Sequence, residues 1–146
     1  IKHLLEGRYE LIYWTENKIQ YYYPEVAGIF ILNNNNALIT LDKNMDTNKS
    51  AELIGWGKYE INSESFHIGW HDWKLLLIEN NIKTVKKKSP WEGMREYSVF
   101  FKDNKLVLTS ITGKQSWNIN KNSIVYMDRE WGKNQDEVVR YWRRVN

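Results

Sequence analysis

The stretch REYSVFFKDNKLVLTS, residues Arg95–Ser110, determines how the rest of the chain is interpreted. Two runs of aromatic and branched apolar residues flank Asp103-Asn104. Both of these residues tolerate the left-handed backbone conformation that a two-residue hairpin turn requires. The stretch therefore predicts a β-hairpin. With this turn, the facing pairs are Phe101 with Leu106, Val99 with Leu108, Tyr97 with Ser110 and Arg95 with Thr112.

The face that these pairs share is apolar beside the turn and polar away from it, where Tyr97 and Arg95 lie. A solid core does not need an arginine on its inner face, whereas a cavity with an apolar body and a polar end does. The alternative is that the strand leaves the core at Arg95. Because Phe100 and Val107 occupy the opposite face, the hairpin alone leaves open which face points inward.

Similar patterns recur along the chain. Apolar runs flank the turn clusters Asn33–Asn36 and Asn62–Ser65, and each pair of runs predicts a further hairpin. The segment Asp72–Lys88 fits either a buried strand or a helix, and its β-rich neighbourhood favours strands. About eight to ten short strands at this spacing predict an all-β fold, a single antiparallel up-and-down barrel. The 146 residues suit one domain, spanning residues 1–146.

The segment FHIGWHDW, Phe66–Trp73, contains two of the three histidines and forms one side of a predicted hairpin. A turn at Ser63-Glu64 places Gly57 opposite Trp70, whose ring then covers the bare glycine. His67 points outward in this register. The inward side chains are expected to be Phe66, Ile68, Trp70 and Asp72.

The two ends of the chain are expected to pair, because a barrel closes through its first and last strands. In GRYELIYW, Tyr9, Leu11 and Tyr13 share one face. In EVVRYWRRV, Arg140 and Trp142 share one face. We expect an arginine of the last strand to cap an aromatic ring of the first by cation–π stacking.

Three segments resemble the lipocalin-like domain family, small calycin-type barrels. The opening LLEGRYELIYW resembles the family's first strand, with Gly7-Arg8-Tyr9 at its Gly-Thr-Trp-type motif. SPWEGMREYSVFFKDNKLVLTS is similar to its Trp-x-Gly segment and the two strands that follow, and VVRYWRRV to its closing strand. The matching residues are Trp91, Gly93, Arg95, Tyr97, Leu106, Leu108, Trp142 and Arg144. The resemblance implies a barrel with a cavity for a small, often apolar molecule, and some relatives with such barrels act as cyclases or isomerases.

Several kinds of site are disfavoured by the sequence. The absence of cysteine excludes disulfides, thiol catalysis and cysteine-based zinc sites. His67 and His71 would share a face on a helix, but four residues of a strand span ~13 Å, too far to share one ion. No G-x-S-x-G motif or glycine-rich phosphate loop is present. We therefore expect neither a metal nor a cofactor.

The sequence predicts a protein that binds a small apolar or aromatic molecule in the barrel cavity. Two alternatives remain: an enzyme that cyclises or isomerises a bound substrate, with Tyr97, Asp72 or a histidine as acid or base, and an interaction protein with exposed aromatic residues. No nucleic-acid partner is expected, because the basic runs fit a solvated loop and a capping arginine. No apolar run is long enough to span a membrane, and the lack of cysteine favours a cytoplasmic location. The candidate ligand-binding residues are Tyr13, Tyr59, Trp70, His71, Asp72, Arg95 and Tyr97.

Overall fold

A computed structural model describes residues 1–46, 48–131 and 135–145. Within these residues there is one four-residue helix and twelve strands. Their bounds are α1 Lys2–Leu5, β1 Gly7–Glu16, β2 Ile19–Tyr22, β3 Val26–Asn33, β4 Asn36–Asp46, β5 Lys49–Ile61, β6 Ser65–Glu79, β7 Ile82–Lys86, β8 Arg95–Lys102, β9 Lys105–Ser110, β10 Gln115–Ile119, β11 Ser123–Trp131 and β12 Asp136–Val145.

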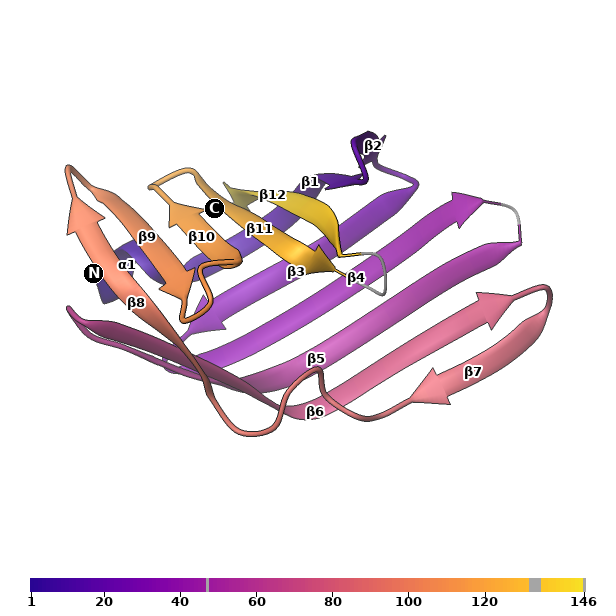
Figure 1. The fold of residues 1–146 in the computed structure, drawn as a ribbon, viewed down its shortest axis with the longest axis horizontal. Helices are drawn as coiled ribbons and strands as arrows, with labels where there is room; N and C mark the ends of the chain where they lie inside the picture. The colour runs from indigo at the N-terminus through magenta and orange to yellow at the C-terminus, as the bar shows by residue number, and fades with distance from the viewer. Residues whose placement is uncertain (47, 132–134, 146) are drawn as a thin grey trace.

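Ten of the strands form a closed antiparallel barrel (Figure 1). Apart from the small additions β2 and β7, each strand pairs with the next along the chain, and β12 pairs with β1 to close the ring. β2 extends the wall beside β1, and β7 pairs with β6. The prediction of an all-β, up-and-down barrel closed by its first and last strands is confirmed.

The predicted hairpins form at asparagine-rich turns. Asn34-Asn35 and Asp103-Asn104 have φ values between 49° and 66°, so both turns use the left-handed conformation that asparagine and aspartate tolerate. Asn80-Asn81 makes a further turn of this kind, between β6 and β7. The segment Asp72–Lys88, which fitted a helix or a strand, is therefore mainly two strands.

The predicted register holds near the turns and changes at β-bulges, two of which affect the candidate site residues. In β8 and β9, Phe101 faces Leu106, Val99 faces Leu108 and Tyr97 faces Ser110, as expected. β9 ends at Ser110, so Arg95 and Thr112 do not pair. One bulge lies in β1 between Leu11 and Tyr13, and the other lies where β5 and β6 pair, between Trp56 and Gly57. Each bulge adds one residue to a strand and reverses the faces beyond it.

One end of the barrel, the closed end, is sealed by α1, which the sequence analysis did not predict. Leu4 and Leu5 are buried there. The Arg144 guanidinium donates to the backbone carbonyls of Leu4 and Glu6. It also donates to the Tyr9 hydroxyl, at a distance of 2.7 Å. Arg144 also lies over the Tyr9 ring, 4.9 Å from its centroid, so the expected cation–π contact between the last and first strands is present.

An aromatic cluster fills the middle of the barrel. Trp117, 5% exposed, lies at its centre. Its ring makes edge contacts with the rings of Phe30, Phe66, Tyr97 and Tyr126 at centroid distances of 5.2 to 6.0 Å. Edge-to-face packing is the favoured arrangement of aromatic rings. The empty space that remains inside the barrel lies directly against this cluster.

Candidate ligand cavity

A cavity of about 810 Å³ lies between the aromatic cluster and the open end of the barrel, the end opposite α1. It reaches solvent at this end, where the lining residues Lys49 and Pro90 are exposed. This volume suits a small organic molecule. Its apolar wall includes Trp14, Phe30, Ile39, Leu41, Leu53, Trp70, Trp73, Leu75, Leu77, Trp91, Trp117, Ile124 and Trp142.

The wall changes from apolar to polar toward the open end, and it does so on several strands. In β4, Ile39 and Leu41 are followed on the same face by Lys43. In β11, Ile124 and Tyr126 are followed by Asp128. The gradient inferred from β8 is therefore general, and it arises because alternate residues of each strand share the inner face.

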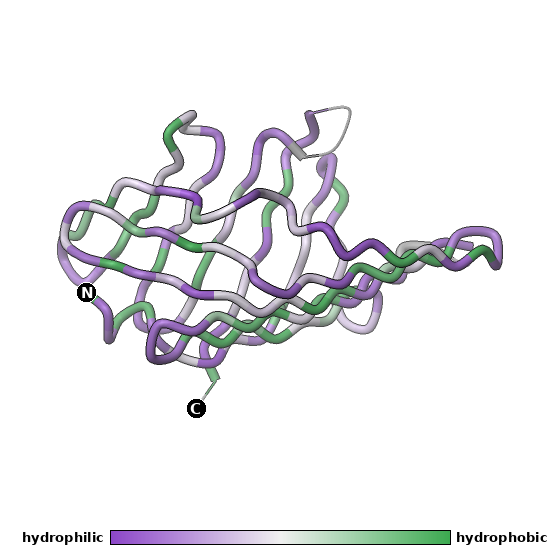
Figure 2. The backbone as a smooth tube through the Cα atoms, turned by 90° about the horizontal axis from the view of Figure 1, so that it is seen from below, coloured by the Kyte–Doolittle hydropathy of each residue, from purple (hydrophilic) through white to green (hydrophobic). Residues whose placement is uncertain are grey.

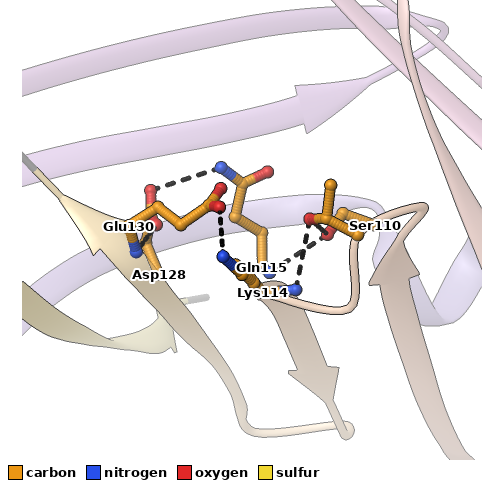
Figure 3. Close-up of polar contacts among 6 residues, drawn as sticks. Ser110, Lys114, Gln115, Asp128 and Glu130 are labelled. Atoms are coloured by element: carbon orange, nitrogen blue, oxygen red, sulfur yellow. Dashed lines mark hydrogen bonds and ion pairs between the residues drawn. The ribbon is translucent and has the colours of Figure 1, made fainter. Parts of the chain in front are cut away.

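A chain of polar side chains links three strands at this level. Arg95 on β8 donates to the Gln115 side-chain oxygen at 2.7 Å. The Gln115 amide in turn donates to Asp128 at 3.5 Å, and Tyr126 donates to the same carboxylate oxygen at 3.3 Å. Figure 3 shows Gln115 lying between Asp128 and Ser110, with Lys114 paired to Glu130 at 2.8 Å beside them.

A second polar group, on β1, β4 and β12, adjoins this chain, because β12 pairs with β11. Lys43 pairs with Glu16 at 2.8 Å and lies over the Trp14 ring, 4.6 Å from its centroid. Arg140 stacks over Trp14 at 4.6 Å and over Tyr126 at 4.9 Å. Burial lowers the pKa of Lys43, and the ion pair with Glu16 opposes this shift.

The tyrosines of the cavity are held in the neutral form. Burial raises the pKa of Tyr97, and Arg95 beside it works in the opposite direction. Burial also raises the pKa of Tyr126, again opposed by a nearby arginine, Arg140. At neutral pH both hydroxyls therefore serve as hydrogen-bond donors and acceptors rather than as bases.

Three of the seven residues chosen from the sequence line the cavity. Trp70, Arg95 and Tyr97 are in its wall, and Arg95 also stacks over Trp91 with 4.0 Å between guanidinium and ring centroid. Tyr59 is fully buried but packs against Phe66, at 6.2 Å between centroids, on the closed-end side of the cavity. The inward direction expected for Tyr59 is thus correct, although it does not line the space itself.

The other three residues lie outside the barrel, and the inward direction expected for Tyr13 and Asp72 is wrong. Tyr13 stacks with Tyr141 at 5.2 Å and 3°. Asp72 is exposed, and His71, also exposed, contacts the Trp56 ring at 5.3 Å. Both errors have one cause: the bulge in β1 turns Trp14 inward in place of Tyr13, and the extra residue in β6 turns Trp73 inward in place of Asp72.

Most of the polar cavity residues, among them Glu16, Lys43, Gln115 and Asp128, were not among those chosen from the sequence. The sequence pattern could have identified two of them as inward-facing, because each continues an alternating apolar series. Lys43 follows Ile39 and Leu41, and Asp128 follows Ile124 and Tyr126. The pairing of Gln115 with Asp128 and of Lys43 with Glu16 has no comparable signal. It depends on which strands the barrel brings together.

The part of the chain that the structure describes contains neither a metal cluster nor a membrane-spanning helix. Over residues 1–46, 48–131 and 135–145, no three histidine or acidic side chains are grouped as a metal site would require. His67 instead lies 3.5 Å from Glu96 on the outer wall. No helix in the described part of the chain is long and apolar enough to cross a membrane.

Comparisons with known proteins do not indicate a function, so the proposal below is based on the cavity. No model of a known protein family matches the chain, and a search of curated proteins finds no significant relative.

Proposed function

We propose that this protein binds a small apolar or aromatic molecule in the barrel cavity, with a polar group of the molecule directed toward the open end. The observation that carries the proposal is the cavity of about 810 Å³ whose wall is aromatic and aliphatic below and polar above. Burial of apolar ligand surface against such a wall supplies affinity, and a few fixed polar groups supply orientation.

Arg95, Gln115 and Asp128 are suited to orient that polar group. Their hydrogen bonds to one another hold the side chains in place before a ligand arrives. A pre-organised site loses less conformational entropy on binding. Because the chain of side chains presents both donors and an acceptor, it favours a ligand head that can do both, such as a hydroxyl or a carboxylic acid.

Membership of the lipocalin-like family is part of this proposal. The closed antiparallel barrel supports it, and so does the contact between two residues of the resembling segment: Trp91 and Arg95 stack at the edge of the cavity. The Trp91 indole donates to the carbonyl of Ile68 at 3.1 Å, which fixes the ring as part of the wall.

Binding is favoured over catalysis by the positions of the acid–base candidates. His71 and Asp72 are exposed on the outside of the barrel, and His67 also lies on the outer wall. Of the residues that the sequence suggested as acid or base, Tyr97 is the one that lines the cavity, and its raised pKa makes it a poor base at neutral pH. A binding protein returns its ligand chemically unchanged.

Native mass spectrometry of freshly purified protein, followed by release of any co-purified molecule, tests the proposal directly. The fluorescent probe 1-anilinonaphthalene-8-sulfonate provides a second assay. Leu53→Trp fills the cavity and is expected to weaken probe binding at least about tenfold by steric exclusion. Ile54→Trp is the matched control, because Ile54 is the next residue of β5 and faces solvent. Equal effects of the two substitutions would contradict a cavity site.

A further inference from the structure

The positive charge of the protein is concentrated in one hairpin. Residues Lys74–Lys88, which we call the basic hairpin, comprise the end of β6, all of β7 and the two lysines that follow. They include five lysines and one glutamate, a net charge of +4, whereas the whole chain carries +3. The other residues are together close to neutral, so the charge is a local feature of this hairpin.

The basic hairpin projects from the open end of the barrel. β7 pairs with β6 through Leu75–Glu79 and Ile82–Lys86, and within the described residues it pairs with no other strand. Figure 1 shows the hairpin at one extreme of the molecule, and Figure 2 shows the narrow extension that it belongs to. All five residues of β7 are exposed.

Apolar side chains and a lysine share the outer face of the hairpin. Leu76 faces Val85 and Ile78 faces Lys83, so all four share this face. Val85 is 46% exposed. The acidic residues nearest to this face, Glu52 and Asp72, lie on β5 and at the base of the hairpin, so positive charge increases toward the free edge at β7.

Other apolar side chains are exposed at the same end of the barrel. Ile82, at the hairpin tip, is 69% exposed. Tyr23 follows β2 and is 77% exposed, and Ile111 follows β9 and is 84% exposed. The open end thus combines exposed apolar residues with a dense positive charge.

We propose that the basic hairpin docks this protein on the surface of an anionic lipid bilayer. Lysines beside an anionic bilayer gain favourable electrostatic energy, and apolar side chains among them enter the interface. The opposite face of the hairpin supports this assignment. Leu75 and Leu77 on that face line the cavity, so a docked hairpin places the cavity entrance next to the bilayer.

Other occupants fit the hairpin less well. Single-stranded nucleic acid is held by aromatic stacking as well as by charge, and residues 74–88 contain no aromatic side chain. Edge-to-edge pairing with a second copy is disfavoured because lysines along an exposed strand oppose it. The hairpin contributes Leu75 and Leu77 to the cavity wall, but the docking proposal does not depend on which molecule the cavity binds.

Co-sedimentation with vesicles tests the proposal. The protein is expected to bind vesicles of equal parts phosphatidylcholine and phosphatidylglycerol, to bind pure phosphatidylcholine weakly, and to be released by added salt. Replacing Lys83, Lys86, Lys87 and Lys88 by glutamine is expected to weaken binding at least tenfold, since each lysine near the surface contributes roughly a factor of five. The control replaces four exposed lysines elsewhere, Lys2, Lys102, Lys105 and Lys121.

A second pair of variants tests the apolar contribution. Ile82→Ser is expected to weaken binding to the mixed vesicles several-fold, whereas Phe100→Ser, at a residue 63% exposed on β8, leaves it unchanged. Circular dichroism establishes that every variant is folded. Equal loss in the two lysine variants, equal binding to both vesicle types, or binding to single-stranded RNA or acidic peptides without binding to vesicles would each overturn the proposal. Probe binding by Leu53→Trp reports on the cavity separately.

Discussion

Tyr9 shows how a single side chain holds the closed end together. Its hydroxyl donates to the Leu5 carbonyl at 2.7 Å and accepts from Arg144 at 2.7 Å, so β1, α1 and β12 meet at one oxygen atom. The ring is fully buried. Arg144 also contacts this ring and the carbonyls at the end of α1, which ties the last strand to the first residues of the chain.

Replacement of Tyr9 by phenylalanine removes both hydrogen bonds and preserves the ring. We expect the free energy of unfolding to fall by about 1–2 kcal/mol, because the Arg144 and Leu5 groups lose a buried partner. Urea titration followed by tryptophan fluorescence measures this change. Tyr13→Phe is the control, since Tyr13 stacks on the outside of the barrel, and it is expected to change stability by less than ~0.5 kcal/mol.

The buried tyrosines also predict how stability responds to alkaline pH. Burial raises the pKa of Tyr9 to about 12 from 10.0, and the pKa values of Tyr97 and Tyr126 are raised as well. A raised pKa in the folded state means that the unfolded state loses its proton first. The stability that Tyr9 contributes is therefore complete below pH 10 and is lost as the pH rises through 12.

For Tyr9, this pKa shift corresponds to roughly 2–3 kcal/mol of unfolding free energy. That contribution is lost between the pKa of the unfolded state, 10.0, and that of the folded state, about 12. Urea titrations at several pH values between 10 and 12 measure this loss of unfolding free energy, and the same titration at neutral pH is the reference. The Tyr9→Phe variant is expected to show a shallower decline. An unfolding free energy that rises with pH in this window would contradict the assignment.

The bulge between β5 and β6 determines which residues reach the cavity. Gly57 pairs with Trp70 as predicted, but its nearest neighbours are backbone atoms. A β-carbon at Gly57 would lie 1.9 Å from the Gly69 carbonyl oxygen. The aromatic ring that covers a glycine is instead Trp73, which lies over Gly55. The bulge thus depends on a close approach of two backbones.

Substitution of Gly57 by alanine is expected to be strongly destabilising, by roughly 3 kcal/mol or more, because a backbone carbonyl cannot move aside as a side-chain tip can. The thermal midpoint and the urea midpoint measure the effect. Ser63→Ala, in the exposed turn of the same hairpin, serves as the comparison and is expected to be near neutral. A Gly57→Ala protein as stable as the parent would show that the backbones are not this close.

Over the whole molecule, the packed core and the candidate ligand cavity lie mainly in different halves of the barrel. The closed half is filled by side chains, including the aromatic cluster around Trp117. The open half contains the cavity and its charged rim. Trp142 stands at the boundary, 1% exposed, with its ring 5.6 Å from that of Phe30.

Removal of the Trp142 side chain is expected to lower the free energy of unfolding by about 3 kcal/mol, through lost packing across the barrel interior. Trp56→Ala is the matched control: Trp56 is 39% exposed on the outer wall, and its loss is expected to cost less than ~1 kcal/mol. Chemical denaturation of the two variants gives the comparison. Equal losses of unfolding free energy in the two variants would show that packing of the aromatic interior is not the main source of stability.

The class of fold and much of the strand register follow from the amino-acid sequence. Alternating apolar residues and turns such as Asp103-Asn104 are local properties, and local backbone preferences are sufficient to specify hairpins. The same alternation correctly placed Trp70, Arg95 and Tyr97 on the inner face, because these residues lie between a turn and the first irregularity of their strands.

The rest of the candidate site depends on how the strands pack together in three dimensions. A bulge shifts the alternation by one residue, and no local pattern marked the bulges that turned Tyr13 and Asp72 outward. The contacts of Arg95 with Gln115 and of Lys43 with Glu16 join strands distant in sequence. In each case one further strand lies between the two that are joined. The contacts form because the curved sheet turns the side chains of these next-but-one strands toward one interior space, and the local sequence of a strand does not encode that arrangement.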